Sequence, residues 1–185
     1  MRTSHSGPRM WRERFIIFDL IGRTCRTAEA AESLRVVNPL YATALFQTAP
    51  PPCGWPRAFA IITACNPRGQ TEDTAQNVEH DARLAERLQT LRCWRWRVIG
   101  GSPDFHHAEP GFAVELPLPD ALAVGCEFEQ EAIFWIEDDE LSVIAAEGEA
   151  RQKLGSWRER LARGNAVRRK APCFGAAPDK NAQNS

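Results

Sequence analysis

The stretch RAFAIITACNP, at residues 57–67, constrains the fold more than any other part of the sequence. Its apolar segment Ala58–Ala64 is uninterrupted and has the length of one strand, which predicts a central strand buried on both faces. The pair Asn66-Pro67 ends this strand, because proline has no N–H to donate to a neighbouring strand. The chain is therefore expected to build a sheet around these residues.

A helix is predicted after the following loop, over Thr74–Leu91. Three leucines at spacings of four and three form one buried stripe along it: Leu84, Leu88 and Leu91. Extended toward the helix start, the stripe reaches Asp81 and Asn77. Either the helix end projects beyond the core and its inner face meets water, or Asn77 bonds the loop at residues 66–70 or a ligand. The second explanation follows from the need of a buried amide for partners.

Shorter patterns predict the remaining elements. In CWRWRVIGG, at residues 93–101, Trp94, Trp96 and Val98 share a face that is expected to pack in the core, with the arginines outside in water. The other predicted elements are strands at Ala42–Thr48 and 111–117, a hairpin at 132–146 that turns at Asp138-Asp139, and helices at Asp120–Glu129 and Ala150–Arg163.

The order of the main elements, β-β-α-β-β-α-β-β, predicts the fold class α+β. The sheet is expected to be mixed or mostly antiparallel, with the two main helices packed mainly on one face. Three segments are expected along the chain: a poorly defined N-terminal extension (1–35), a single α+β domain (36–148), and a basic C-terminal helix with a disordered tail (149–185).

Charge is distributed unevenly along the chain. Residues 36–150 carry 7 basic and 18 acidic side chains, a net charge of −11, whereas residues 151–185 carry 9 basic and 2 acidic ones, a net charge of +7. An acidic domain is not expected to read nucleic acid itself. The basic C-terminal end, in contrast, can contact nucleic acid, a protein partner or the acidic face of its own domain.

The sequence also predicts where the protein acts and which cofactor sites it lacks. It shows no apolar run long enough to cross a bilayer and no secretory signal, so we expect a soluble cytoplasmic protein of bacterial type with no membrane partner. None of the 6 cysteines forms a CxxC pair, so they are expected to be buried free thiols. Adjacent residues point in different directions, so His106-His107 is poorly arranged for a metal, and no metal site is predicted.

Five polar residues are candidates for a ligand site. Asn66 ends the central strand and Asn77 lies in the first turns of the next helix, a favourable place for an anion or a polar ligand. His107 and Glu109 share one side of an extended chain, where the carboxylate can orient the imidazole. Gln130 follows a helix. Structural explanations also apply: Asn66 as a turn residue, His107 as a solvated loop residue, Glu109 as a tie for a loop, and Gln130 as a partner for backbone carbonyls.

Four short motifs occur in one order: ITACNPRG, Asn77 with its leucine stripe, HHAEPGF and FEQEAIFW. Together they resemble the bacterial domain of unknown function family 3293, over roughly Leu40–Ala145. One position departs from the family, since Gly111 stands where the family usually has a small hydroxyl residue. The resemblance implies domain boundaries and no mechanism. The shared residues are Asn66, Pro67, Asn77, His107, Glu109, Pro110, Phe112, Phe128, Gln130 and Ala132.

Known catalytic patterns such as GxSxG, the P-loop and HExxH are absent from the sequence, which therefore assigns neither a reaction nor a cofactor. The first hypothesis is a domain that binds a small polar or nucleotide-like ligand in a cleft formed by Asn66, Asn77, His107 and Glu109. The alternative is a non-enzymatic regulatory or interaction protein, whose basic C-terminal tail contacts nucleic acid or a protein partner. In a third account the polar residues only stabilise the fold.

Overall fold

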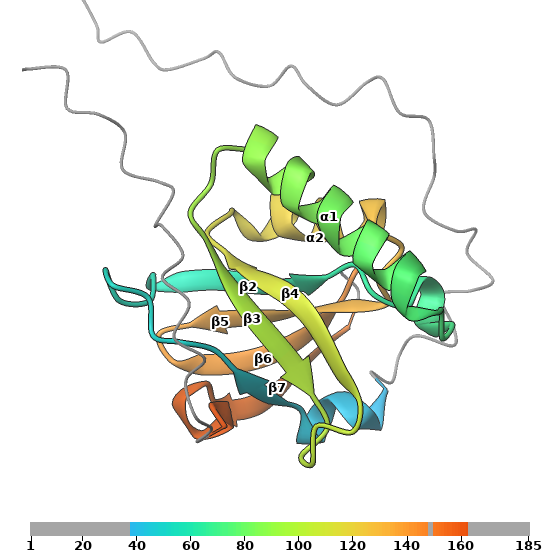
Figure 1. Cartoon of the computed structure of the whole chain (residues 1–185). Coiled ribbons are helices and arrows are strands. Elements are labelled where there is room, and N and C mark those ends of the chain that lie inside the picture. The colour runs from blue at the N-terminus through green and yellow to red at the C-terminus, as the bar shows by residue number, and fades with distance from the viewer. Residues whose placement is uncertain (1–37, 148–149, 163–185) are drawn as a thin grey trace, which may run out of the picture.

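The computed structural model of the chain describes residues 38–147 and 150–162. These residues form seven strands and two α-helices, with short 3-10 segments between them (Figure 1), which confirms the α+β class. The strands are β1 (Leu45–Gln47), β2 (Ala58–Thr63), β3 (Arg95–Gly101), β4 (Ala108–Val114), β5 (Ala132–Glu137), β6 (Glu140–Ala145) and β7 (Arg151–Ser156). The helices are α1 (Thr74–Thr90) and α2 (Leu118–Glu127), and the 3-10 segments are η2 (Pro39–Thr43), η3 (Pro67–Gly69) and η4 (Arg158–Arg160).

All strands belong to one antiparallel sheet in the order β1-β3-β4-β2-β5-β6-β7. β2 lies at its centre, between β4 and β5. The connection β2-α1-β3 passes over β4, and the connection β4-α2-β5 passes over β2. The segment from β2 to β5 therefore has the split βαβ arrangement of a β-α-β-β-α-β unit, to which β1 is added at one edge and β6 and β7 at the other.

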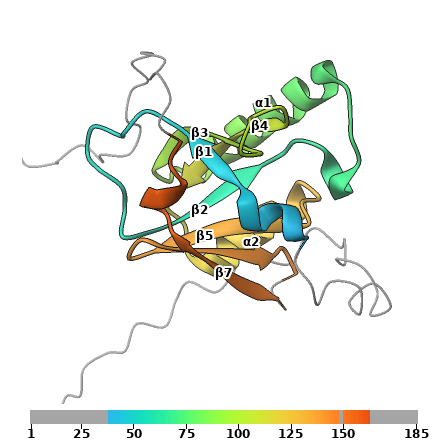
Figure 2. The same ribbon diagram turned by 90° about the horizontal axis from the view of Figure 1, so that it is seen from below.

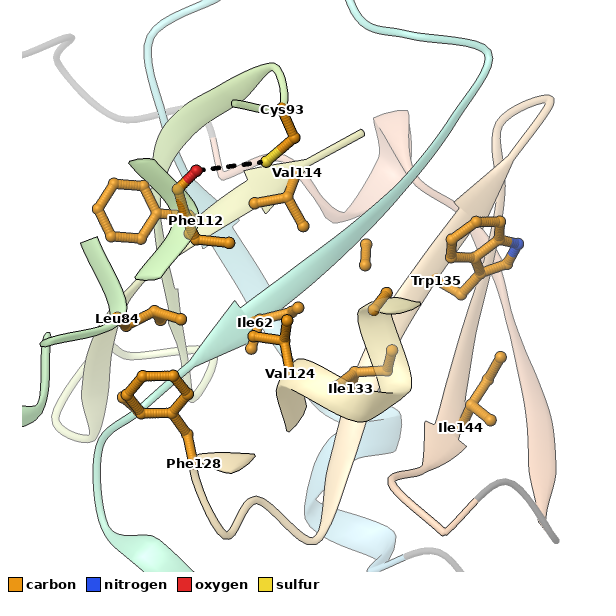
Figure 3. Close-up of a cluster of buried hydrophobic side chains, with 14 residues drawn as sticks. Ile62, Leu84, Cys93, Phe112, Val114, Val124, Phe128, Ile133, Trp135 and Ile144 are labelled. Atoms are coloured by element: carbon orange, nitrogen blue, oxygen red, sulfur yellow. Dashed lines mark hydrogen bonds between the residues drawn. The ribbon is translucent and has the colours of Figure 1, made fainter. Parts of the chain in front are cut away.

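Both helices pack against one face of the sheet (Figure 1), and Figure 3 shows the buried side chains that they share with the strands in one cluster. From β2, Ala60 and Ile62 point into this core, while Phe59 and Ile61 point to the opposite face, as strand alternation requires. Burial on both faces is the reason that the sequence of β2 is uninterruptedly apolar. The helices contribute Leu84 and Leu88 from α1, and Ala121 and Val124 from α2.

The opposite face holds an aromatic core that the sheet encloses by curling. Phe46 of β1 is fully buried and packs against Trp157, with ring centroids 5.0 Å apart. The two ends of the sheet meet here, because Phe46 forms a bridge with Leu161 and its carbonyl accepts a 2.8 Å hydrogen bond from the amide of Ala162. Figure 2 shows the segment after β7 lying beside β1. This second core is thus closed by sheet curvature rather than by helices.

The helix predicted over Ala150–Arg163 is wrong. Residues Arg151–Ser156 form β7, which pairs with β6, and the chain then enters η4. Two features favour the strand: the edge of β6 needs a partner, and Trp157 fills the aromatic core. The sheet therefore extends beyond residue 148. The predicted extension at 1–35 and tail at 163–185 lie outside the described residues, as do Cys25 and Cys173.

The arginine face of β3 is partly open to water, as predicted, and it also contacts α1. Trp96 and Val98 are buried in the aromatic core as expected, while the Arg97 side chain on the other face is 45% exposed. Arg97 binds both carboxylate oxygens of Asp81, at 2.6 and 2.7 Å, and its guanidinium carbon lies 4.1 Å from the centre of the Phe112 ring. Asp81, the polar residue that lies next to Leu84 on the inner side of α1, thus has a charged partner.

The described cysteines are free, but not all of them are buried. Cys65 and Cys93 are buried, and burial raises the pKa of both thiols, whereas Cys53 is exposed. Within residues 38–147 and 150–162, the structure shows no cluster of three or more residues suited to hold a metal ion and no helix able to span a membrane.

Candidate functional site

Asn66 links three elements at the end of β2. Its side-chain amide donates a 2.6 Å hydrogen bond to Oε1 of Glu109 in β4, and its Oδ1 accepts a 3.0 Å bond from the amide of Glu72. Its backbone is left-handed, with φ 51° and ψ 58°, a conformation that asparagine tolerates better than most residues. Asn66 is therefore a turn residue, as one explanation held, and also the centre of a hydrogen-bond network.

Asn77 holds this turn against the start of α1. Its Oδ1 accepts a 2.8 Å hydrogen bond from the backbone amide of Asn66, and its Nδ2 donates to Oδ1 of Asn66 at 3.1 Å and to the carbonyl of Glu72 at 3.3 Å. Asn77, one turn before Asp81 on the inner face of α1, thus bonds the loop, which is one of the two explanations that the sequence left open.

The first turn of α1 is already occupied by a carboxylate of the chain. Asp73 caps the helix, because its side chain accepts a 2.8 Å hydrogen bond from the amide of Gln76, and the Gln76 side chain bonds back to the amide of Asp73. A ligand anion would have to compete with Asp73 for this position. The structure therefore does not favour the helix start as an anion site.

Glu109 and His107 lie side by side at the beginning of β4. The imidazole Nε2 of His107 is 3.2 Å from Oε1 of Glu109, the same oxygen that accepts the bond from Asn66. The side chain of Glu109 is 23% exposed and that of His107 is 69% exposed, so the pair reaches the surface. His106, in contrast, is 91% exposed and 3.9 Å from Asp104, away from this pair.

Gln130 supports the same loop from the other side and does not contact Glu109. Its Nε2 donates 3.1 Å hydrogen bonds to the carbonyls of Cys65 and Phe128, which matches the structural explanation. The neighbouring Arg68 donates its backbone amide to the carbonyl of Glu129 at 2.7 Å and forms an ion pair with the Glu129 side chain. The end of α2 thus fixes the loop that Asn66 begins.

Three acidic or phenolic residues near the loop were not predicted from the sequence. Glu131 lies against the loop, because a Cβ atom built on Gly69 would be 2.9 Å from Glu131 Oε1. Tyr41 of η2 packs edge-on against Phe134, with ring centroids 5.6 Å apart. Burial, then the charges of Glu131 and Glu109, raise the pKa of Tyr41 to about 12. Glu72 Oε2 is buried and lies 2.9 Å from Nε2 of His80, although this contact lacks hydrogen-bond geometry.

A surface depression at the turn between β5 and β6 is a weaker candidate. Its charged groups already have partners: Asp138 pairs with Arg57 at 2.9 Å, Lys153 with Glu140 at 2.7 Å, and Asp139 accepts a 2.7 Å bond from Ser156. It contains none of the five candidate residues. The depression is lined by Asp138, Asp139, Glu140, Lys153, Gly155 and Ser156.

The structure thus brings Asn66, Asn77, His107 and Glu109 into one connected cluster at the end of the central strand, with Gln130 behind the loop. A comparison with models of protein families matches the segment that contains this cluster. No curated protein and no solved structure matches the chain. Residues 62–133, which run from β2 into β5 and contain all five candidates, match the model of the family described as protein of unknown function (DUF3293), so the chain resembles that family.

Proposed function

We propose that the cluster around Glu109 binds a small polar ligand that carries N–H or O–H donors. The observation that supports this most directly is that Asn66 donates to one carboxylate oxygen, Oε1, and that the imidazole Nε2 of His107 lies 3.2 Å from the same oxygen. Among the described residues no donor bonds Oε2. Because the Glu109 side chain is 23% exposed, a ligand in solution can reach this acceptor.

The carboxylate is also held in place before any ligand arrives. Asn66 donates to it, and Asn66 is itself fixed by Asn77 and by the amide of Glu72. A group that is already oriented loses little conformational freedom on binding, which favours affinity and selectivity. Such a chain of supporting bonds is what a binding carboxylate needs.

His107 adds a second contact beside Glu109. Its imidazole can donate to a ligand or accept from one, and beside a carboxylate it has the arrangement of a general base. Binding is the proposal, and turnover of any ligand found is measured as a second step. A nucleotide-like ligand would be bound through the donors of its base, since a carboxylate accepts from amino groups of bases.

The competing account is that the cluster only stabilises the fold. A thermal-shift screen of metabolites, amines, amides and nucleosides on the wild type, Glu109→Gln and Glu86→Gln separates the two. Glu86 is exposed on α1 and serves as the control. A ligand at about 100 times its Kd adds about 2.7 kcal/mol of stability. We expect at least one compound to raise the Tm of the wild type and of Glu86→Gln but not of Glu109→Gln.

Two outcomes of this screen would contradict ligand binding through Glu109. If no compound stabilises the wild type, or if each hit stabilises Glu109→Gln to the same extent, the cluster does not bind ligands through Glu109. A fall in the Tm of Glu109→Gln without any change in ligand response would then support the purely structural account.

The alternative role of the basic C-terminal end depends on residues 163–185. Within the described part, Lys153 lies 2.7 Å and Arg151 3.8 Å from Glu140, and Arg158 lies 3.7 Å from Asp139. These three cations are thus directed at acidic groups of the same domain, and Arg160 donates to the backbone carbonyls of Ala44 and Leu154. A contact with nucleic acid or a partner through the remaining tail stays a separate prediction.

A further inference from the structure

We propose that the aromatic core contains a further ligand site, which the Trp55 side chain fills in this structure and leaves when a ligand enters. The ligand is a flat, uncharged aromatic compound with a hydrogen-bond acceptor at its edge. This site is independent of the proposed one, because Trp55 lies just before β2, whereas the Glu109 cluster lies at the other end of that strand.

The ring of Trp55 is in contact with three other aromatic rings of this core. It stacks on Phe59, with ring centroids 5.1 Å apart and 19° between the ring planes. The rings of Trp94 and Trp157 meet it edge-on, with centroids at 6.1 and 5.3 Å. Stacked and edge-on contacts are the arrangements that flat aromatic groups prefer. The position of Trp55 is therefore shaped for one flat aromatic group of the size of an indole.

Trp55 belongs to the loop at residues 50–56, which is anchored at its two ends. The carbonyls of Ala49 and Arg57, on either side of the loop, accept hydrogen bonds of 2.6 and 3.0 Å from β3 and from the turn after β5. Within the loop, the described residues form one hydrogen bond, from the amide of Gly54 to the carbonyl three residues before it, at 3.0 Å.

The sequence of this loop also prevents it from joining the sheet. Four of its seven residues are prolines, which have no N–H to donate to a neighbouring strand. Figure 2 shows the connection between β1 and β2 as a wide loop. Ring contacts rather than backbone bonds thus hold Trp55 in place, so its side chain can leave the core while the anchors and the sheet stay intact.

Trp157, at one side of this position, has an unpaired hydrogen-bond donor. Its indole N–H has no acceptor among the described residues, although the residue is 2% exposed. A buried N–H without an acceptor costs free energy, which an acceptor on a ligand would recover. Trp55 brings no acceptor, because an indole side chain is only a donor. A ligand with a ring nitrogen at its edge therefore offers what Trp55 lacks, and this difference favours the exchange.

Quinoline and naphthalene form a matched pair of probes, since they have nearly the same shape and only quinoline has a ring nitrogen that accepts a hydrogen bond. Their binding to the full chain is followed by NMR of the tryptophan indole N–H groups at neutral pH, where quinoline is uncharged. The variants are Trp55→Ala, Trp157→Phe, which keeps a ring in the core but removes the N–H, and the control Trp135→Phe. Trp135 lies in the helix-side cluster (Figure 3). Thermal melts check that each variant is folded.

We expect quinoline to shift the indole N–H signal of Trp157 in the wild type and to bind at least about fivefold more tightly than naphthalene, because naphthalene leaves that donor unpaired. Trp55→Ala should bind quinoline at least about tenfold more tightly than the wild type, since no side chain has to leave first. Trp157→Phe should bind both compounds equally, and Trp135→Phe should behave as the wild type.

The wild type alone is sufficient to refute this site. An unchanged Trp157 signal at the highest soluble quinoline concentration, or equal affinity for quinoline and naphthalene, would overturn the inference. Unchanged quinoline affinity in Trp55→Ala, or a preference for quinoline that persists in Trp157→Phe, would overturn it as well.

Discussion

Replacing Asn77 by alanine removes three hydrogen bonds from the junction of β2, the loop and α1. The bonds join Asn77 to the amide and side chain of Asn66, at 2.8 and 3.1 Å, and to the carbonyl of Glu72, at 3.3 Å. Each is worth about 1 kcal/mol net, while alanine in a helix gains about 0.6 kcal/mol over asparagine. The free energy of unfolding should therefore fall by about 2–2.5 kcal/mol. With about 2.1 cal/mol/K of unfolding entropy per residue over the described residues 38–147 and 150–162, the Tm should fall by about 8–10 °C.

Urea unfolding followed by circular dichroism measures this change, with Gln89→Ala as the matched control. Gln89 lies exposed on the same helix, so its replacement removes an amide of similar chemistry without removing the contacts made by Asn77. We expect Gln89→Ala to change the free energy of unfolding by no more than about 0.5 kcal/mol. If Asn77→Ala costs no more than Gln89→Ala at an unchanged m-value, the network does not hold the loop, and Asn66 is not fixed as a support for Glu109.

Three other predictions test separate parts of the structure. Tyr41 is the single tyrosine, so the absorbance of tyrosinate reports on it alone. We expect its titration midpoint in the folded protein to be about 12, and lower in Glu131→Gln. The free energy of unfolding should fall as pH rises from 10.0 to about 12, because the folded state favours the neutral phenol. A midpoint near 10.0 in the folded protein contradicts this. Trp157→Ala should cost about 3–5 kcal/mol in urea unfolding, and a cost below about 1 kcal/mol would remove Trp157 from the core. Deleting residues 163–185 should abolish salt-dependent DNA binding in fluorescence anisotropy. Binding that survives, or a full chain that binds no DNA, refutes that role for the tail.

The elements predicted best are those whose sequence pattern is local and strong. The apolar run of β2 and the leucine stripe of α1 each follow from burial of one continuous segment, and both lie within one or two residues of their predicted bounds. The hairpin of β5 and β6 also turns at the predicted pair, Asp138-Asp139, where both residues adopt positive φ. In these cases the neighbours along the chain decide the structure.

The elements predicted wrongly depend on distant partners. β7 has a basic, mostly exposed sequence that shows no strand alternation, and it is a strand because the edge of β6 is available to pair with it. Trp157, directly after it, is buried by β1, which precedes it by more than a hundred residues. The ion pair of Arg97 with Asp81 of α1, which the sequence does not predict, likewise depends on how the helix crosses the sheet. No local pattern contains this information.

The residues of the candidate site also differ in whether a local sequence pattern predicts them. Four of its residues could be selected from motifs, because a strand end, a helix start and an extended His-x-Glu segment each have a local signature. Tyr41 and Glu131 were missed, since the packing of Tyr41 on Phe134 depends on where β1 pairs in the sheet and the approach of Glu131 to Gly69 depends on the end of α2. A single tyrosine in a short 3-10 segment carries no sequence pattern that links Tyr41 to Glu109, 68 positions later.

The proposed binding of a small polar ligand by Glu109, as oriented by Asn66, is tested by amide NMR of the chain with the best stabilising compound. We expect the shift changes to centre on the amides of Asn66, His107 and Glu109, to saturate with added compound, and to disappear in Glu109→Gln while persisting in Glu86→Gln. Shift changes centred on another part of the sheet, or changes that persist unaltered in Glu109→Gln, would contradict the account.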